Sequence, residues 1–191
     1  MDSINISVIG TGYVGAVTGT CLAEMGNRVT FVGRNREKLD LLGSGKTPIY
    51  EPGLEELLTT NKERIKTTTD LSSAIKETDI TFVCVGTPSR DDGSIDLQQI
   101  NDVSVTIGKS LAENEKYHTI IVKSTVLPGT TEEFIIPILE RESGKKAFID
   151  FGIASNPEFL KEGSAVDDFF HTDRVVIGVN DKKTENVLKN L

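Results

Sequence analysis

A short apolar strand followed at once by three spaced glycines is the feature that most constrains this chain. Residues 4–9 fit a buried strand, and Gly10, Gly12 and Gly15 come directly after it. In this G-x-G-x-x-G spacing, the first glycine permits a tight turn and the second lets the backbone approach a pyrophosphate. The third lets the next helix pack close to the strand. That helix, which we expect to be amphipathic, would aim free N–H groups at phosphates. The pattern therefore predicts a dinucleotide site.

The end of the second expected strand departs from the usual form of such a site. An acidic residue normally stands there and accepts hydrogen bonds from the ribose hydroxyls. Gly33 occupies this place after the strand at 28–32, and Arg34 follows it. Arg34 and Arg36 offer two guanidinium groups that would suit a 2′-phosphate, which indicates NADP or a relaxed preference. Alternatively, Asn35 only caps the next helix and the cations are solvated. Both interpretations can hold together.

Length and charge narrow the class of protein. A chain of 191 residues with 37% hydrophobic content can bury one core, so we expect a single domain. The net charge of −8 and the lack of a basic block argue against nucleic acid or an anionic membrane surface as a partner. Neither a signal peptide nor a membrane span is visible, which predicts a cytoplasmic protein.

The cysteines and histidines give no sign of a metal site. Cys21 and Cys84 lie far apart without metal-ligand spacing, and His118 and His171 are isolated. We expect no bound metal, and we expect both thiols to be buried and unreactive.

Strand and helix patterns alternate along the chain. Such alternation predicts an α/β fold with a doubly wound, Rossmann-type parallel sheet, helices on both faces, and ligands at the carboxyl ends of the strands. Further strands are expected at 65–68, 80–85, 119–123, 148–154 and 174–179, and helices at 36–42, 53–60, 71–76, 97–111, 130–142 and from 182 onward.

Two loops at expected strand ends carry hydroxyl groups. Thr87 follows the strand at 80–85 and could bond a ribose or phosphate, although a plain turn explains the loop equally well. Ser124 and Thr125 follow the strand at 119–123 and should face the crevice or its rim.

A third loop, residues 155–163, carries carboxylates. If it is helical, Glu158 and Glu162 share one face with Lys161 beside them, and one carboxylate could act as a base. A solvated helix face is the alternative.

Five motifs, at 10–15, 47–58, 85–97, 123–131 and 155–178, match the nucleotide-sugar dehydrogenases in sequence order. The chain resembles this family over nearly its whole length, and the UDP-glucose 6-dehydrogenase branch most closely. The alternatives are a GDP-mannose or UDP-N-acetylhexosamine dehydrogenase, a non-catalytic dinucleotide-binding module, and a small β-hydroxyacid dehydrogenase.

The resemblance implies oxidation of a UDP-sugar, UDP-glucose to UDP-glucuronate, in two NAD-dependent steps through a cysteine thioester. It assigns the catalytic roles to Glu158, acting through water, to Thr125 and to Glu162. The cofactor would contact Gly10, Gly12, Tyr13, Val14, Gly15, Arg34, Lys38, Thr87, Thr125 and Glu162. The sugar nucleotide would contact Glu158, Phe159, Leu160 and Lys161, and Tyr13 would border the reacting sugar.

Two departures from the family pattern matter. The acidic residue is missing at Gly33, so NAD preference is not carried over directly. The family's nucleophilic cysteine, with the lysine and asparagine before it, has no counterpart here. We therefore expect residues 1–191 to be the cofactor domain of a longer, homodimeric enzyme. Alone, such a domain should bind cofactor without completing the reaction, and should expose apolar surface where the rest would pack.

Overall fold

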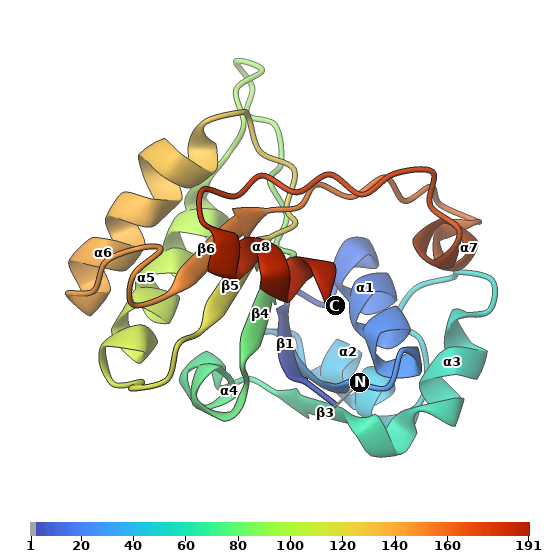
Figure 1. The fold of residues 1–191 in the computed structure, drawn as a ribbon. Coiled ribbons are helices and arrows are strands. Elements are labelled where there is room, and N and C mark those ends of the chain that lie inside the picture. Colours follow the sequence, from blue (N-terminus) through green and yellow to red (C-terminus); the bar gives the residue numbers. More distant parts are fainter. Residues whose placement is uncertain (1–2) are drawn as a thin grey trace.

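The computed structural model describes residues 3–191, and within them six parallel strands form one sheet (Figure 1). The spatial order is β3-β2-β1-β4-β5-β6. Every neighbouring pair is parallel, with Ile6 of β1 opposite Val29 of β2 on one side and Ile80 of β4 on the other. The strands are β1 (Asn5–Ile9), β2 (Arg28–Val32), β3 (Ile65–Thr68), β4 (Ile80–Val83), β5 (Thr119–Val122) and β6 (Gly152–Ser155).

Side chains that alternate along the strands build two cores. Ile6 and Val8 of β1 face one core, whereas Ile9 belongs to the other. The first core is covered by α1 (Tyr13–Glu24), α2 (Arg36–Ser44), α3 (Leu54–Thr60), α7 (Ala165–Phe170) and α8 (Lys182–Lys189). The second is covered by α4 (Leu71–Glu77), α5 (Gln98–Ala112), the π-helical turn η2 (Thr131–Ile135) and α6 (Ile136–Ser143). A 3₁₀ turn, η1 (Lys62–Arg64), leads into β3. The predicted doubly wound parallel sheet is confirmed.

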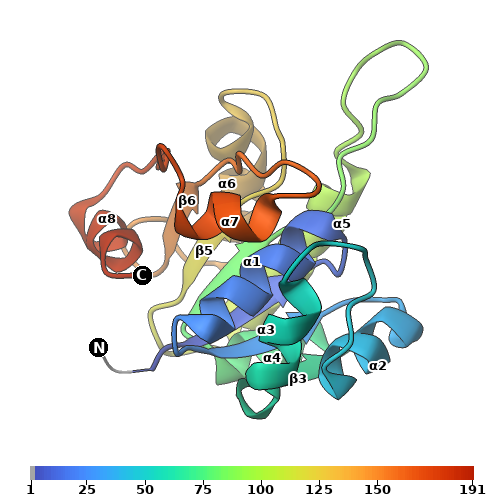
Figure 2. The ribbon, with the colours of Figure 1, turned by 90° about the vertical axis from the view of Figure 1, so that its right-hand side faces the viewer.

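The chain order reverses at the centre of the sheet. β1 continues outward to β2 and β3, and the chain then crosses back to β4 on the other side of β1. Ligands of doubly wound sheets bind in the crevice outside the carboxyl ends of the strands at such a switch point. Figure 2 shows α1 lying along the sheet beneath α7, and the loop between β4 and α5 projecting from the body.

Several predicted elements differ in the structure. Residues 174–179 form no strand: only Gly178 pairs, antiparallel, with Ser155 at the end of β6. Val175 and Val176 are exposed, so the β-branched run that suggested a strand has no sheet neighbour along its length. The strand predicted at 148–154 begins only at Gly152, because Phe148 adopts a left-handed φ of 66° and the chain turns there.

Two helices also depart from expectation. The helix predicted at 130–142 starts as the π-helical turn and becomes α-helical at Ile136, one residue before Pro137. Proline removes an N–H donor and collides with the carbonyl four residues earlier, so a regular helix through this point is unfavourable. The helix α1 is not amphipathic: it is buried from Gly15 to Ala23, because α3 and α7 cover the side that does not face the sheet.

A buried polar chain crosses the second core side of the sheet around His118. The ring Nδ1 lies 3.1 Å from the Thr78 carbonyl, which can only accept, so Nδ1 carries the proton. Nε2 then accepts from the Thr81 hydroxyl at 2.7 Å, and Ser7 lies 2.6 Å from the same hydroxyl. Burial lowers the pKa of His118 to about 4. The arrangement holds a neutral imidazole.

We predict that His118 makes folding stability fall in mild acid. The unfolded histidine binds its proton near pH 6.5 and the folded one only near pH 4, so the unfolded state holds more protons between these values. Stability should be full above about pH 6.5 and fall toward pH 4, by at most about 1.4 kcal/mol per pH unit. Urea unfolding of the His118→Gln variant at pH 7 and pH 5 should show a smaller difference than the wild type. The exposed His171→Gln variant should retain the wild-type difference, and equal pH dependence in both variants would contradict the assignment.

Candidate functional site

The glycine-rich turn between β1 and α1 has the geometry of a phosphate-binding turn. Gly10 has a φ of 111°, and a Cβ there would lie 2.4 Å from the Cys84 carbonyl oxygen. A Cβ on Gly15 would lie 1.9 Å from the Gly10 carbonyl oxygen, so only glycine lets α1 approach this closely. A Cβ on Gly12, in contrast, would meet nothing within 4 Å. The fold therefore requires Gly10 and Gly15, whereas the bare backbone at Gly12 leaves room for a ligand.

A cavity of about 450 Å³ opens in front of this turn. Gly10, Gly12 and the end of β2 line one side, and the residues after β4 and the first turns of α5 line the other. The α1 N-terminus at Gly12 has no side-chain cap from the described part of the chain. Its first N–H groups are thus free to bind an anion such as a pyrophosphate. The residues present fit a dinucleotide.

At the end of β2 the structure confirms the cap, whereas binding of a 2′-phosphate stays a prediction and Arg36 is exposed and does not line the cavity. The Asn35 side chain accepts from the Lys38 N–H at 3.0 Å and caps α2, as the alternative proposed. Gly33, Arg34 and Lys38 nevertheless line the cavity. The Arg34 guanidinium reaches toward α5, 3.5 Å from Oε1 of Gln99.

Hydrogen bonds tie together the loops that follow β4 and β5. The Ser124 hydroxyl donates to the Val85 carbonyl at 2.7 Å and is buried, so it supports the loop; Ser124 and Thr125 line a separate cavity at the ends of β5 and β6. The Thr87 hydroxyl donates to the Thr125 carbonyl at 2.7 Å, which brings these two predicted cofactor residues side by side. Neither lines the cavity in front of the glycines, although Val85 and Gly86 do.

Cys21 and Cys84 are both buried, as predicted. Burial raises the pKa of each thiol to about 12. Cys84 adjoins the cofactor cavity but remains a thiol at neutral pH, and a thiol is a poor nucleophile compared with a thiolate. Neither residue is suited to form a thioester.

The loop after β6 is not a helix, so Glu158 and Glu162 do not share a helix face. Residues 156–161 are irregular and turns follow up to α7. The Glu158 carboxylate folds back and accepts from the Leu160 N–H at 2.7 Å, whereas Glu162 is exposed. Phe159 is 48% exposed and lies beneath the Arg174 guanidinium, 5.4 Å from its ring centre. Glu158, Phe159 and Leu160 nevertheless all line one cavity.

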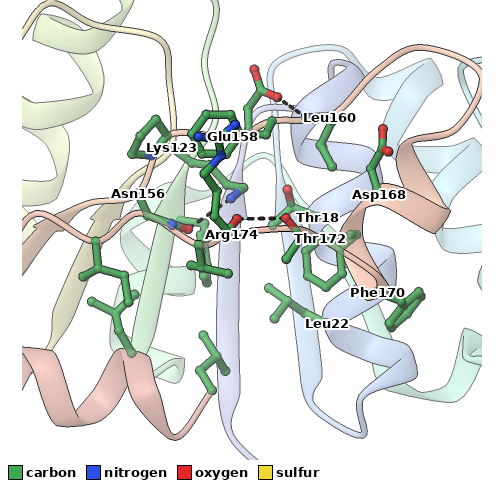
Figure 3. Close-up of a pocket in the computed structure, with 18 of the residues that line it drawn as sticks. Thr18, Leu22, Lys123, Asn156, Glu158, Leu160, Asp168, Phe170, Thr172 and Arg174 are labelled. Atoms are coloured by element: carbon green, nitrogen blue, oxygen red, sulfur yellow. Dashed lines mark hydrogen bonds between the residues drawn. The ribbon is translucent and has the colours of Figure 1, made fainter.

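Glu158 and Leu160 line a second cavity, of about 320 Å³, on the α1 face of the sheet (Figure 3). Figure 3 shows Lys123, Asn156 and Glu158 together on one side of this cavity, with Leu22 and Phe170 on another. The buried Lys123 ammonium donates to Oδ1 of Asn156 at 3.0 Å. Burial lowers the pKa of Lys123, and the nearby Cys84 and Glu158 oppose that shift. Sequence reasoning missed Lys123 and Asn156, because only the sheet edge brings the ends of β5 and β6 together.

A buried carboxylate, Glu51, holds the Glu158 loop in place. It is 4% exposed, accepts from the Tyr13 hydroxyl at 2.5 Å, and accepts from the N–H groups of Gly163 and Ala165 at 2.9 and 2.8 Å. Burial alone would raise the pKa of Glu51, but these bonds lower it below its usual value. These hydrogen bonds join α1 and the start of α7 to the segment that precedes α3. The position lies within the motif at 47–58, but the sequence did not indicate that the carboxylate is buried.

Two predicted site residues, Tyr13 and Lys161, are engaged within the protein. Burial, with Glu51 alongside, raises the pKa of Tyr13, whose hydroxyl also lies 3.2 Å from the Lys161 carbonyl. The Lys161 N–H and ammonium both contact Asp168, at 2.9 and 3.3 Å. Tyr13 and Lys161 therefore connect the glycine-rich turn to the Glu158 loop. Val14, predicted beside the cofactor, is half-buried against the first core.

These features define a dinucleotide-binding domain of the doubly wound class. Residues 4–191 match the UDP-glucose/GDP-mannose dehydrogenase family, NAD binding domain. The chain belongs to this family of nucleotide-sugar dehydrogenases, whose domain binds NAD.

The relatives agree with this assignment. GDP-mannose 6-dehydrogenase of Pseudomonas aeruginosa is 45% identical over 98% of this chain and 44% of its own. A UDP-glucose 6-dehydrogenase of Bacillus subtilis is 42% identical over 98% of this chain and 42% of its own. The crystal structure of a ternary complex of the Pseudomonas enzyme superimposes with a TM-score of 0.96, over 98% of this chain and 43% of that one. The chain thus spans less than half the length of these relatives.

No helix in the described residues 3–191 is long and apolar enough to cross a membrane.

We predict that two glycine substitutions separate folding from cofactor binding. Gly15→Ala places a methyl group against the Gly10 carbonyl and should lower the melting temperature strongly. Gly12→Ala meets no protein atom and should keep most of the stability, losing about 1 kcal/mol at the helix N-cap. It should nevertheless weaken NAD binding by at least about tenfold, since its methyl group occupies the pyrophosphate space. Thermal unfolding and calorimetric titration with NAD check both variants. Unchanged NAD affinity in Gly12→Ala would place the pyrophosphate elsewhere.

Glu51→Gln should loosen the Glu158 loop. The amide presents an N–H group to backbone N–H donors and leaves at least one buried donor unpaired, which costs about 1–3 kcal/mol. Urea unfolding measures the loss, and hydrogen exchange at Gly163 and Ala165 should accelerate. Glu56→Gln, on the exposed side of α3, is the matched control. Equal stability of the two variants would show that Glu51 does not support the loop.

Proposed function

We propose that this chain is the cofactor domain of a longer enzyme that oxidises the C6 alcohol of a nucleotide sugar to a carboxylate in two NAD-dependent steps. The observation that carries the proposal is the connection through Glu51. It ties Tyr13 of the glycine-rich turn to the Glu158 loop, so that the cofactor turn and a carboxylate-bearing loop share one edge of the sheet. A plain dinucleotide-binding module has no evident use for this second loop.

In the proposed reaction, NAD accepts hydride from the sugar. The α1 N-terminus holds its pyrophosphate, and the linked Thr87 and Thr125 contact a more distant part of the cofactor, outside the cavity in front of the glycines. Glu158 acts through water as the base, and Phe159 and Leu160 contact the sugar nucleotide. Glu162, which is exposed, faces the nicotinamide and substrate only when the rest of the enzyme closes the site. The nucleophilic cysteine comes from outside residues 1–191, since burial suppresses the reactivity of Cys21 and Cys84.

Two substrates deserve testing first. The sequence predicted UDP-glucose, and UDP-glucose 6-dehydrogenases are among the relatives at 41–42% identity. Relatives named GDP-mannose 6-dehydrogenase are 43–47% identical. The difference in identity is small, and the chain covers only 42–44% of these relatives, so we propose both substrates as candidates.

Turnover by the full-length protein distinguishes them. With the right substrate, two NADH should form per sugar nucleotide, and the purified product should be the uronate. UDP-glucose, GDP-mannose and a UDP-N-acetylhexosamine are compared at equal concentration. The chain of residues 1–191 alone should bind NAD but form no product. Turnover with none of the three, despite bound NAD, would favour a non-catalytic role.

We expect Glu158→Gln in the full-length protein to lower kcat by about 10²–10⁴ with little change in KM, because general bases typically contribute that much. Steady-state kinetics measure the two parameters separately. Asp167→Asn, an exposed carboxylate on α7, serves as the control and should leave kcat unchanged. A rise in KM alone would make Glu158 a binding residue.

A further inference from the structure

We infer that Lys123 is a positioning residue, whose buried ammonium keeps the Glu158 carboxylate at the cavity on the α1 face of the sheet (Figure 3). The inference rests on the proposed function, because it takes Glu158 as the base of the reaction. Lys123 comes directly after β5, and alternation along the strand puts it on the same face as Ile121 of the first core. A charged side chain is unusual on such an apolar face.

The Lys123 ammonium is buried, but its hydrogen bonds are incomplete. The residue is 8% exposed, and its one acceptor within residues 3–191 is Oδ1 of Asn156, at 3.0 Å. An ammonium has three N–H donors. None of the ion pairs formed by the described residues includes Lys123. Because a buried charge is costly, methionine, which has a similar length, would suit the fold alone as well as lysine does.

Glu158 is the carboxylate on which this ammonium can act. Two carboxylates occur among the described residues that line the cavity, Glu158 and Asp168. Asp168 is already engaged by the N–H and the ammonium of Lys161. Glu158 accepts a single hydrogen bond within the described part of the chain, from the Leu160 N–H of its own loop. Burial lowers the pKa of Lys123, and Glu158 is among the groups that oppose this shift, so the two charges interact.

Asn156 connects the same ammonium to the backbone of the Glu158 loop. Its Oδ1 accepts from Lys123, and its Nδ2 donates to the Val176 carbonyl at 2.8 Å. Glu158 follows two residues later, after Pro157, whose ring fixes the backbone φ between them. Lys123 therefore acts on the start of this loop through Asn156 and on its carboxylate through charge.

The reaction gives this arrangement a use. A base that acts through water must lie within hydrogen-bond reach of that water, and a displacement of about 1 Å can cost about 10²-fold in rate. The Glu158 side chain is half-buried, so it can also turn toward solvent. A fixed cation at the cavity favours the rotamers that keep the carboxylate there, since opposite charges attract more strongly away from bulk water.

Steady-state kinetics of the full-length protein test the inference with Lys123→Met. kcat should fall by about 10–100-fold, because the base is no longer held in place. KM for the sugar nucleotide should change by less than about twofold. The melting temperature should change little, since methionine removes a buried charge together with one hydrogen bond. Lys123→Arg should recover most of kcat, because the adjoining cavity has room for the guanidinium. Lys66→Met, on the exposed side of β3, is the matched control and should leave kcat unchanged.

A double-mutant cycle separates an action through Glu158 from general support of the fold. If Lys123 acts through Glu158, Lys123→Met should lower kcat little further in the Glu158→Gln background. A wild-type kcat in Lys123→Met, equal losses in both backgrounds, or a rise in KM alone would overturn the inference and leave the proposed function standing. Absence of turnover by the wild type with all three sugar nucleotides would instead reject the proposed function, and the inference with it.

Discussion

The close approach of α1 to the turn after β1 is the contact on which the rest of the structure depends. With Gly15 set against the Gly10 carbonyl, the helix lies on the sheet at the switch point between β1 and β4. Its N-terminus then faces the crevice where the carboxyl ends of the strands converge. Because the helix is buried on the sheet side and also under α3 and α7, the same contact organises both the core and the anion site.

A second layer of organisation comes from buried polar groups. Glu51 joins the glycine-rich turn to the loop that carries Glu158, and Lys123 joins the ends of β5 and β6 through Asn156. A buried charge is tolerated only with hydrogen-bond partners, so each of these side chains constrains several backbone segments at once. The edge of the sheet is thereby held in one arrangement before any ligand binds.

The cofactor cavity combines a common fold with an uncommon residue, Gly33, at the end of β2. The phosphate-binding turn has the glycine spacing of dinucleotide sites, and Thr11 of this turn lies against Gly33 at the end of β2.

The sequence by itself determined the sheet, most of its elements, the phosphate-binding turn and the family, because these depend on local periodicity and on glycine spacing. It also placed Arg34 beside Gly33, and the structure confirms that both line the cavity. Local patterns could not show that 174–179 lacks a strand partner, that the Glu158 loop is irregular, or that Ser124 turns inward. Nor could they reveal Glu51, Lys123 or the contact of Thr11 with position 33. Each of these depends on residues far apart in sequence that only the packed sheet edge brings together, where burial and hydrogen-bond partners decide what a side chain does.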